Sequence, residues 1–274
     1  MIISNNTAMN SIIVGSLSVL SYTIASILIF RELITRCEQH RNSIRLAWSG
    51  AILHGIYISQ IFQRFNGFNF SFFNAAALVA LFIVLLLLIA ALDKPVEKLG
   101  IAIFPLAGVL LGLDMVFPEK NHPISTQNWE MTIHILSSIT AFSLLNIAAL
   151  QAILLAIQDQ QLRSHNPQRL ITALPPLQAM ETLLFQMIGV GLFFLTVSLL
   201  SGFFFIEDLF AQHLVHKTVL SIIAWIIFSS LLLGRMRYGW RGNTAIQWTL
   251  IGFVLLLLAY FGSKLVLEFI LNRI

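Results

Sequence analysis

The stretch SFFNAAALVALFIVLLLLIAAL, residues 71–92, decides the fold class of this chain. It contains no Lys, Arg, Asp or Glu, and it is as long as a helix must be to cross a bilayer. Apolar and polar residues do not alternate in it as they would in a strand. Since a helix satisfies every backbone amide within its own segment, which lipid requires, a membrane-spanning helix is predicted here.

Further apolar segments of similar length lie on both sides of this stretch. The expected spans are 9–30, 44–62, 71–92, 99–117, 131–157, 183–205, 214–233 and 246–270. The first is expected to stay in the mature chain, because no Lys or Arg precedes Arg31 and no small-x-small cleavage site follows it. We therefore predict an all-α polytopic transmembrane helix bundle of about eight spans. It forms a single integral membrane domain over 1–274, with a cytoplasmic loop at about 158–182.

The composition excludes most other classes of protein. The 274 residues are 58% hydrophobic and 10% charged, whereas a soluble chain carries roughly 25% charged residues. A cytosolic enzyme, a nucleic-acid-binding domain and a disordered chain are thereby excluded. The single cysteine, Cys37, rules out a disulfide framework and any CxxC or CxxCH motif.

The basic residues between the spans predict the orientation in the membrane. One side carries eleven Lys and Arg and the other side five. Because cytoplasmic loops are enriched in Lys and Arg, the first set is assigned to the cytoplasm and both termini are predicted to be extracytoplasmic. The first set comprises Arg31, Arg36, Arg41, Arg45, Lys94, Lys98, Arg163, Arg169, Arg235, Arg237 and Arg241.

Four of the seven histidines lie in or at the edge of predicted spans, where ionisable groups are costly and often functional. His134 and His216 fall at the outer ends of two different spans, and two neutral imidazoles at one depth suit a haem iron between them. Interfacial histidines wetted by lipid headgroups are an equally open interpretation. His213 and His216 could instead share a helix face and bind copper or zinc with a third ligand, although we favour an interfacial role for His213.

His54 differs from these because it lies roughly 15 Å from the cytoplasmic end of its span, near the middle of the bilayer. It is either a core histidine hydrogen-bonded to a neighbouring helix or a relay ligand for something that crosses the membrane. Asp114, near the outer end of the fourth span, is expected to reach the interface. Lys264 is expected to snorkel outward or to pair with Glu268.

Two further patterns bear on function. The segment GRMRYGWRG, residues 234–242, is the densest basic and aromatic cluster, and its expected role is anchoring at the cytoplasmic headgroups. No GxxxxGK[ST], HExxH or GxSxG motif occurs, and no nucleophile–base pair or carboxylate dyad can be assembled. Catalysis is therefore the least expected function.

Two blocks of sequence carry a resemblance to a known family. The first is WEMTIH at 129–134, which runs into LLNIAALQAILLAIQDQQ at 144–161. The second joins HKT at 216–218, Ala224-Trp225, GRMRYGWRG, WTL at 248–250 and AYFGSKLVLE at 259–268. On these blocks the chain resembles the cytochrome c assembly protein family, the haem-handling membrane proteins of cytochrome c maturation, and within it the YpjD/HemX-type branch.

The resemblance implies that the chain binds haem b, with His134 and His216 as the axial pair on the iron and His54 as an intramembrane ligand. It also implies a multi-pass protein of the bacterial inner (plasma) membrane that handles, transports or presents haem in cytochrome c biogenesis, beside other maturation proteins. The Trp-rich outer segment of better-known members is absent from residues 206–215, which favours an accessory, transport or regulatory role over enzymatic haem attachment. The alternatives are a small-solute or metal transporter that uses His54 and Asp114, and a regulatory or structural membrane partner without haem.

Overall fold

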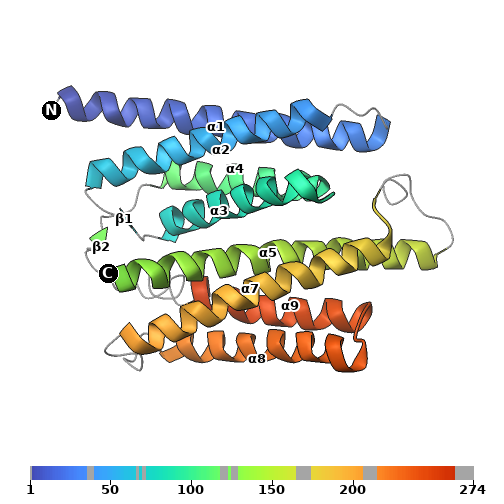
Figure 1. Cartoon of the computed structure of the whole chain (residues 1–274). Coiled ribbons are helices and arrows are strands. Elements are labelled where there is room, and N and C mark those ends of the chain that lie inside the picture. Colours follow the sequence, from blue (N-terminus) through green and yellow to red (C-terminus); the bar gives the residue numbers. More distant parts are fainter. Residues whose placement is uncertain are drawn as a thin grey trace. The chain divides into compact units, whose positions relative to one another are not determined.

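The computed structural model describes residues 2–35, 40–65, 68–69, 72–117, 123–124, 129–164, 174–205 and 215–262. Contacts along the chain divide it into two compact units, unit 1 at Met1–Gln127 and unit 2 at Asn128–Ile274 (Figure 1). The described residues form eight long helices and one pair of two-residue strands, so the predicted all-α helical fold is confirmed. That the whole chain forms one membrane domain stays a prediction.

Unit 1 contains four long helices and the short strand pair. Its elements are α1 (Ile2–Thr35), α2 (His40–Phe65), β1 (Phe68–Asn69), α3 (Phe72–Asp93), η1 (Glu97–Leu99), α4 (Gly100–Val116) and β2 (Pro123–Ile124). The two strands pair antiparallel, with Phe68 opposite Ile124. Helix α1 packs along α2 and α4, and α3 packs against α4.

Unit 2 contains the other four long helices. They are α5 (Trp129–Arg163), α7 (Leu177–Phe205), α8 (Val215–Tyr238) and α9 (Asn243–Leu257), and α9 continues into the π-helical turn η2 (Leu258–Gly262). Helix α7 packs along α5, and α8 packs along α9 (Figure 1). Helix α9 also contacts α5, which closes the unit around an aromatic centre at Phe142.

Seven helical segments are long and apolar enough to cross a membrane, and they include every long helix of the described residues except α2. Helix α2, expected to span at 44–62, contains His54 and several other polar residues that lower its mean hydropathy. It nevertheless buries Ser43 and His54 completely while leaving Ile52 60% exposed. The seven apolar helices fit membrane spans, and the eighth span expected at 44–62 stays a prediction.

Helix α1 likewise buries polar or amphipathic side chains and exposes apolar ones. Helix α1 buries Ser18 and Tyr22 but exposes Leu17 and Leu20 at 47% and 56%. Exposed apolar residues on this scale would be a liability in water, but they are the normal surface of a helix in lipid. The fold is therefore that of a polytopic membrane protein, whereas the orientation deduced from Lys and Arg stays a prediction.

The predicted loop at 158–182 is shorter than expected, because helices extend into it from both sides. Helix α5 continues to Arg163, where an ion pair of 3.0 Å with Asp159 supports its last turn. Helix α7 begins at Leu177, directly after the Pro175-Pro176 pair, and the Gln158 side chain donates a hydrogen bond of 3.0 Å to the Pro175 carbonyl. Residues 165–173 lie outside the described part of the chain.

Candidate functional site

His134 lies in the second turn of α5, where its half-buried ring meets the end of α7. Its Nδ1 is 2.9 Å from the Ser198 carbonyl oxygen and 3.3 Å from the Ser201 Oγ. A carbonyl oxygen only accepts hydrogen bonds, so Nδ1 carries the proton. The lone pair of the neutral ring is therefore on Nε2, which no described residue engages in a hydrogen bond. The contact with α7 fixes both the orientation and the tautomer of the imidazole.

The two serines on α7 make this contact possible, and they were not predicted from the sequence. Ser198 and Ser201 are buried, and the Ser201 Oγ donates to the Ser198 carbonyl at 3.0 Å. Their small side chains let the imidazole approach the backbone of α7. Two serines three residues apart at the outer end of the sixth predicted span could have indicated a partner for His134, because His134 was expected at that same end.

His216 is the second residue of α8 and is exposed. Helix α5 starts, α7 ends and α8 starts at one end of unit 2 (Figure 1), so His134 and His216 lie at the same end of this unit. No hydrogen bond or ring contact joins the two imidazoles among the described residues. The structure thus brings them to one end of the unit, and their convergence as an axial pair stays a prediction.

His54 lies in unit 1 and is completely buried. Its Nδ1 is 3.3 Å from the Tyr22 hydroxyl on α1, and the Tyr22 ring stacks on Phe104 of α4 at 6.0 Å. Tyr22 also fills the space beside Gly50, where a Cβ would lie 2.8 Å from the tyrosine ring. His54 is therefore a buried histidine hydrogen-bonded to a neighbouring helix through Nδ1, and its role as a ligand stays a prediction.

The other ring nitrogen of His54, Nε2, is buried and has no hydrogen-bond partner in the part of the chain that the structure describes. Leaving a buried polar group unpaired costs roughly 1–3 kcal/mol, and native proteins contain few such groups. Like the Nε2 of His134, this buried nitrogen has its lone pair or proton available to a bound ligand.

Asp114 lies near the end of α4 and is buried, so the expectation that it reaches the interface is wrong. Its Oδ2 accepts hydrogen bonds from the Tyr57 hydroxyl at 2.9 Å and from the Asn74 Nδ2 at 3.5 Å. These contacts draw the carboxylate inward between α2 and α3. Tyr57 is three residues beyond His54, so both side chains lie on one face of α2.

Three of the other residues singled out from the sequence fall outside the described part of the chain. His213, Lys264 and Glu268 lie outside the described residues, as do the loop residues 206–214. Among the residues that the structure describes, no group of three or more His, Cys, Asp or Glu is close enough to hold a metal ion. The copper or zinc alternative at His213 and His216 stays untested.

These features define a polytopic membrane protein with one tautomer-fixed imidazole at the end of a helical unit and another imidazole buried in the core. The sequence profile described as Cytochrome C assembly protein matches residues 39–271. The chain therefore belongs to the cytochrome c assembly protein family.

Several relatives share extended similarity with the chain. The inner membrane protein YpjD of Escherichia coli (strain K12) is 34% identical over 207 residues, which cover 75% of this chain and 78% of the relative. An uncharacterised 28.8 kDa protein of Azospirillum brasilense is 32% identical over 51% of this chain and 52% of its own length. The cytochrome c biogenesis protein CcsA of Chlamydomonas reinhardtii is 26% identical over 53% of this chain and 40% of the relative. No solved structure matches. With its apolar helices and its similarity to YpjD, the chain is a multi-pass bacterial inner-membrane protein.

Proposed function

We propose that this protein binds haem b at the outer end of unit 2, with Nε2 of His134 and the imidazole of His216 as axial ligands. The observation that carries the proposal is the 2.9 Å contact between the His134 Nδ1 and the Ser198 carbonyl. Histidines that bind metals almost always donate their other ring N–H to a carbonyl, a carboxylate or water. His134 has this arrangement, and its Nε2 is left to act as the donor atom.

The chemistry of the donors and their surroundings fits a haem. Two neutral imidazoles satisfy the two axial positions of haem iron. Phe203 and Phe204 follow Ser201 closely on α7 and are 68% and 71% exposed. In the proposed site, exposed aromatic side chains at this end of α7 supply apolar surface for a porphyrin face. Bound haem would supply the iron that these imidazoles bind. The chain orients the His134 ring and provides apolar side chains that cover the porphyrin.

We assign His54 as an intramembrane ligand on the route of the haem. The support is its buried Nε2, which has no hydrogen-bond partner among the described residues. The Tyr22 hydroxyl binds the Nδ1 of the same ring and so fixes the orientation of Nε2. In this role unit 1 holds haem within the membrane, and unit 2 presents it at the outer surface.

The cellular role that follows is cytochrome c biogenesis, in which the protein transports or presents haem to other maturation proteins. Its family and its similarity to CcsA, a cytochrome c biogenesis protein, support this role. Residues 206–215 contain no tryptophan. An accessory role in handling haem therefore fits the chain better than enzymatic attachment of haem to apocytochrome.

The proposal is tested by the absorbance of protein purified in detergent from haem-replete cells. We expect a Soret band in the wild type that is lost in His134→Ala and in His216→Ala. His40→Ala, at the predicted cytoplasmic end of α2, is the control and should keep the band. A colourless wild-type preparation, or a band that survives in His134→Ala, would overturn the proposal.

A second candidate function is transport of a small solute or metal through unit 1. The buried contacts of Tyr57 and Asn74 with Asp114 favour it, because Tyr57 lies on the same face of α2 as His54. It predicts flux into liposomes that is lost in Asp114→Asn and His54→Gln but unchanged in His134→Ala. A structural partner without haem would instead co-purify with its target regardless of any histidine substitution.

A further inference from the structure

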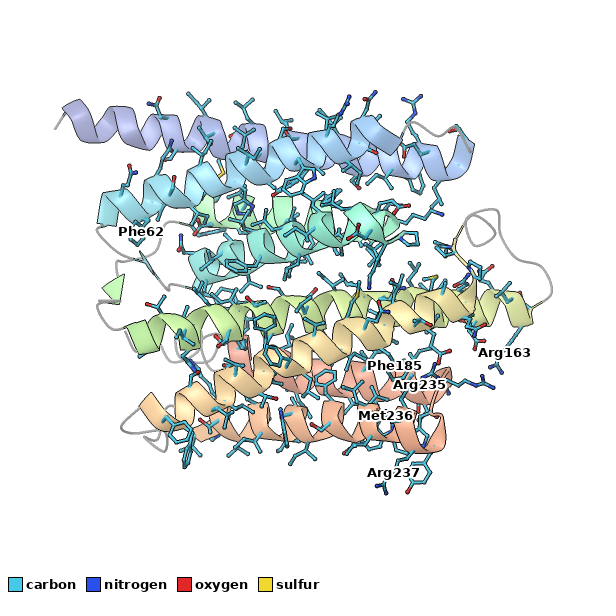
Figure 2. The ribbon with its side chains drawn as sticks, in the orientation of Figure 1. Phe62, Arg163, Phe185, Arg235, Met236 and Arg237 are labelled. Atoms are coloured by element: carbon cyan, nitrogen blue, oxygen red, sulfur yellow. The ribbon has the colours of Figure 1, made fainter. Side chains whose placement is uncertain are left out.

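The connection between α8 and α9 has a chemical role that the haem proposal does not use. We call residues 234–242, GRMRYGWRG, the α8–α9 corner. It contains three arginines, Arg235, Arg237 and Arg241, at the predicted cytoplasmic end of unit 2. Figure 2 shows Arg235 directed toward Phe185 of α7, whereas the Arg237 side chain points away from the helices of unit 2.

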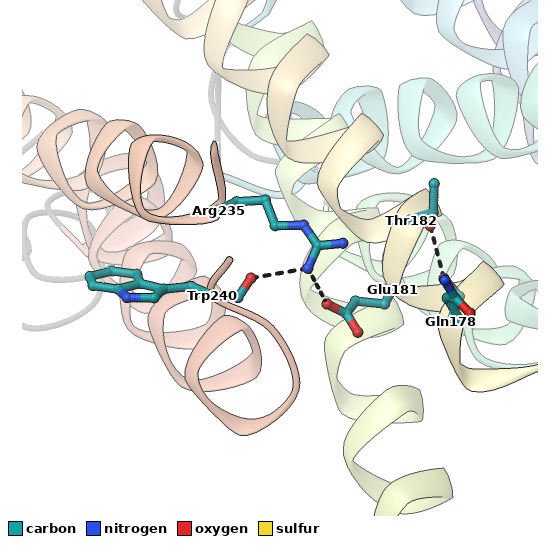
Figure 3. Close-up of polar contacts among 5 residues, drawn as sticks. All are labelled: Gln178, Glu181, Thr182, Arg235 and Trp240. Carbon is teal, nitrogen blue, oxygen red and sulfur yellow. Dashed lines mark hydrogen bonds and ion pairs between the residues drawn. The ribbon is translucent and has the colours of Figure 1, made fainter. Parts of the chain in front are cut away.

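The contacts of Arg235 all lie within unit 2. Its Nη1 donates to the Glu181 Oε1 at 2.9 Å and to the Trp240 carbonyl at 3.2 Å (Figure 3). Its guanidinium group also lies 4.8 Å from the centre of the Phe185 ring. Glu181 is buried, and this pair joins α7 to the corner. Arg235 is therefore a structural residue.

The corner is held in one conformation by close packing. A Cβ at Gly234 would overlap the Trp240 indole, so this position requires glycine. Gly239 and Gly242 adopt φ values of 65° and 59°, which favour glycine. The Trp240 ring stacks on Tyr238 at 6.4 Å and packs on Trp248 at 5.5 Å. The flanking arginines thus extend from a rigid frame.

Arg237 and Arg241 are exposed, and neither forms an ion pair with a described residue. The acidic residue bound at the corner, Glu181, is already neutralised by Arg235. Met236 and Tyr238, beside Arg237, are 82% and 76% exposed. The corner therefore presents two unpaired cations next to an apolar and an amphipathic side chain, a combination typical of the headgroup region.

The outer face of α8 leads directly to these cations. Val219, Ile226 and Leu233 are 43%, 51% and 60% exposed, and their spacing of seven residues places them on one stripe. Arg237 follows Leu233 by four residues and continues the same stripe. From Ile226 to Arg237 the helix rises about 16 Å, close to the roughly 15 Å of hydrocarbon in one leaflet. A lipid whose chains cover this stripe would place its phosphate at Arg237.

We propose that the α8–α9 corner binds the headgroup of an anionic phospholipid of the cytoplasmic leaflet. Arg237 and Arg241 bind its phosphate, because guanidinium groups form paired hydrogen bonds with phosphate oxygens. Tyr238 and Met236 lie at the boundary of headgroup and chains, and the acyl chains cover the α8 stripe. The apolar stripe is the reason that the ligand is a lipid rather than a free phosphate.

The test measures thermal stabilisation of the purified, delipidated full-length protein by added lipid. Phosphatidylglycerol should raise the melting temperature in a saturable manner, whereas phosphatidylcholine, inorganic phosphate and glycerol phosphate should not. In the double variant Arg237→Gln/Arg241→Gln the apparent affinity should fall about thirtyfold. The charge-preserving variant Arg237→Lys/Arg241→Lys should retain most of it.

Arg163→Gln is the matched control, because Arg163 is an exposed arginine at the same end of unit 2 and should not affect lipid binding. Leu233→Gln should weaken binding of phosphatidylglycerol through the stripe alone. Equal stabilisation by phosphatidylcholine, or an unchanged affinity in the double glutamine variant, would overturn the proposal. Equal stabilisation by soluble phosphate would show a phosphate site without a lipid and would overturn it as well.

Discussion

The two units hold their central histidines in opposite ways. In unit 1, His54 is completely buried and its Nδ1 meets a hydroxyl group, which can donate or accept. In unit 2, His134 is half-buried and its Nδ1 meets a carbonyl, which can only accept. The difference teaches that an atom that can only accept a hydrogen bond, rather than burial, fixes the tautomer of these imidazoles. A fixed tautomer at the rim suits lasting ligation, and an unfixed one in the core suits a transient contact.

The units also differ in how they hold buried polar groups. Unit 1 relies on neutral donors, such as Tyr57 and Asn74 on Asp114. Unit 2 uses the Arg235–Glu181 ion pair, and its exposed Arg163 pairs with Asp159. Substitutions that remove these contacts should therefore have effects of different size in the two units.

The largest effect is expected from Arg235→Ala. It leaves Glu181 buried without its partner, and breaking a buried pair costs about 3–5 kcal/mol. Because the Arg235 side chain is 34% exposed, we expect unit 2 to lose about 2–3 kcal/mol of unfolding free energy. Unfolding in mixed detergent micelles measures it. The control Arg163→Ala breaks an exposed pair and should cost less than about 0.5 kcal/mol. Equal losses in the two variants would contradict the structural role of Arg235.

A smaller effect is expected from Gly50→Ala in unit 1. The new methyl group would meet the Tyr22 ring at 2.8 Å, and the stacked Phe104 leaves that ring little room to move. Overpacking of this kind costs about 1–3 kcal/mol. Gly55→Ala on the same helix meets nothing within 4 Å and should stabilise the protein by about 0.5–1 kcal/mol. Thermal unfolding of the two variants in one detergent gives the comparison, and destabilisation by both would show that the packing at Tyr22 is not the cause.

The smallest effects compare the two histidine contacts directly. Tyr22→Phe removes the hydrogen bond between the Tyr22 hydroxyl and the His54 ring and should cost about 1 kcal/mol. Ser201→Ala leaves the His134 Nδ1 its shorter bond to the Ser198 carbonyl, so we expect a cost of less than about 0.5 kcal/mol. Denaturation midpoints of both variants check this order. A larger loss in Ser201→Ala would show that the hydroxyl, and not the carbonyl, holds the rim imidazole.

Much of the fold could be predicted because lipid imposes a strong and local constraint. The span expected at 71–92 is α3 at Phe72–Asp93, since an uninterrupted apolar run leaves only a helix as a solution. The ends of α5 and α7 were predicted less well. Beyond the bilayer no hydropathy signal marks where a helix stops, and α5 continues to Arg163. The Pro175-Pro176 pair was the available sign that a helix begins at Leu177.

The sequence identified which residues belong to the candidate site, but it did not predict which residues they contact. Histidines in membrane spans stand out because few ionisable groups occur there. The partner of His134 is a backbone carbonyl, which every residue possesses, so no sequence pattern identifies it. The burial of Asp114 likewise depends on Tyr57 and Asn74, which come from two other helices. Such contacts require the packing of the helices to be known.

The most direct test of haem ligation by His134 is electron paramagnetic resonance of the oxidised, haem-loaded protein. We predict a low-spin signal with two imidazole ligands in the wild type, and its loss in His134→Gly. Free imidazole added to His134→Gly should restore the signal, because the substitution leaves space beside the Ser198 carbonyl. An unchanged low-spin signal in His134→Gly without imidazole would contradict the assignment of His134 as an axial ligand.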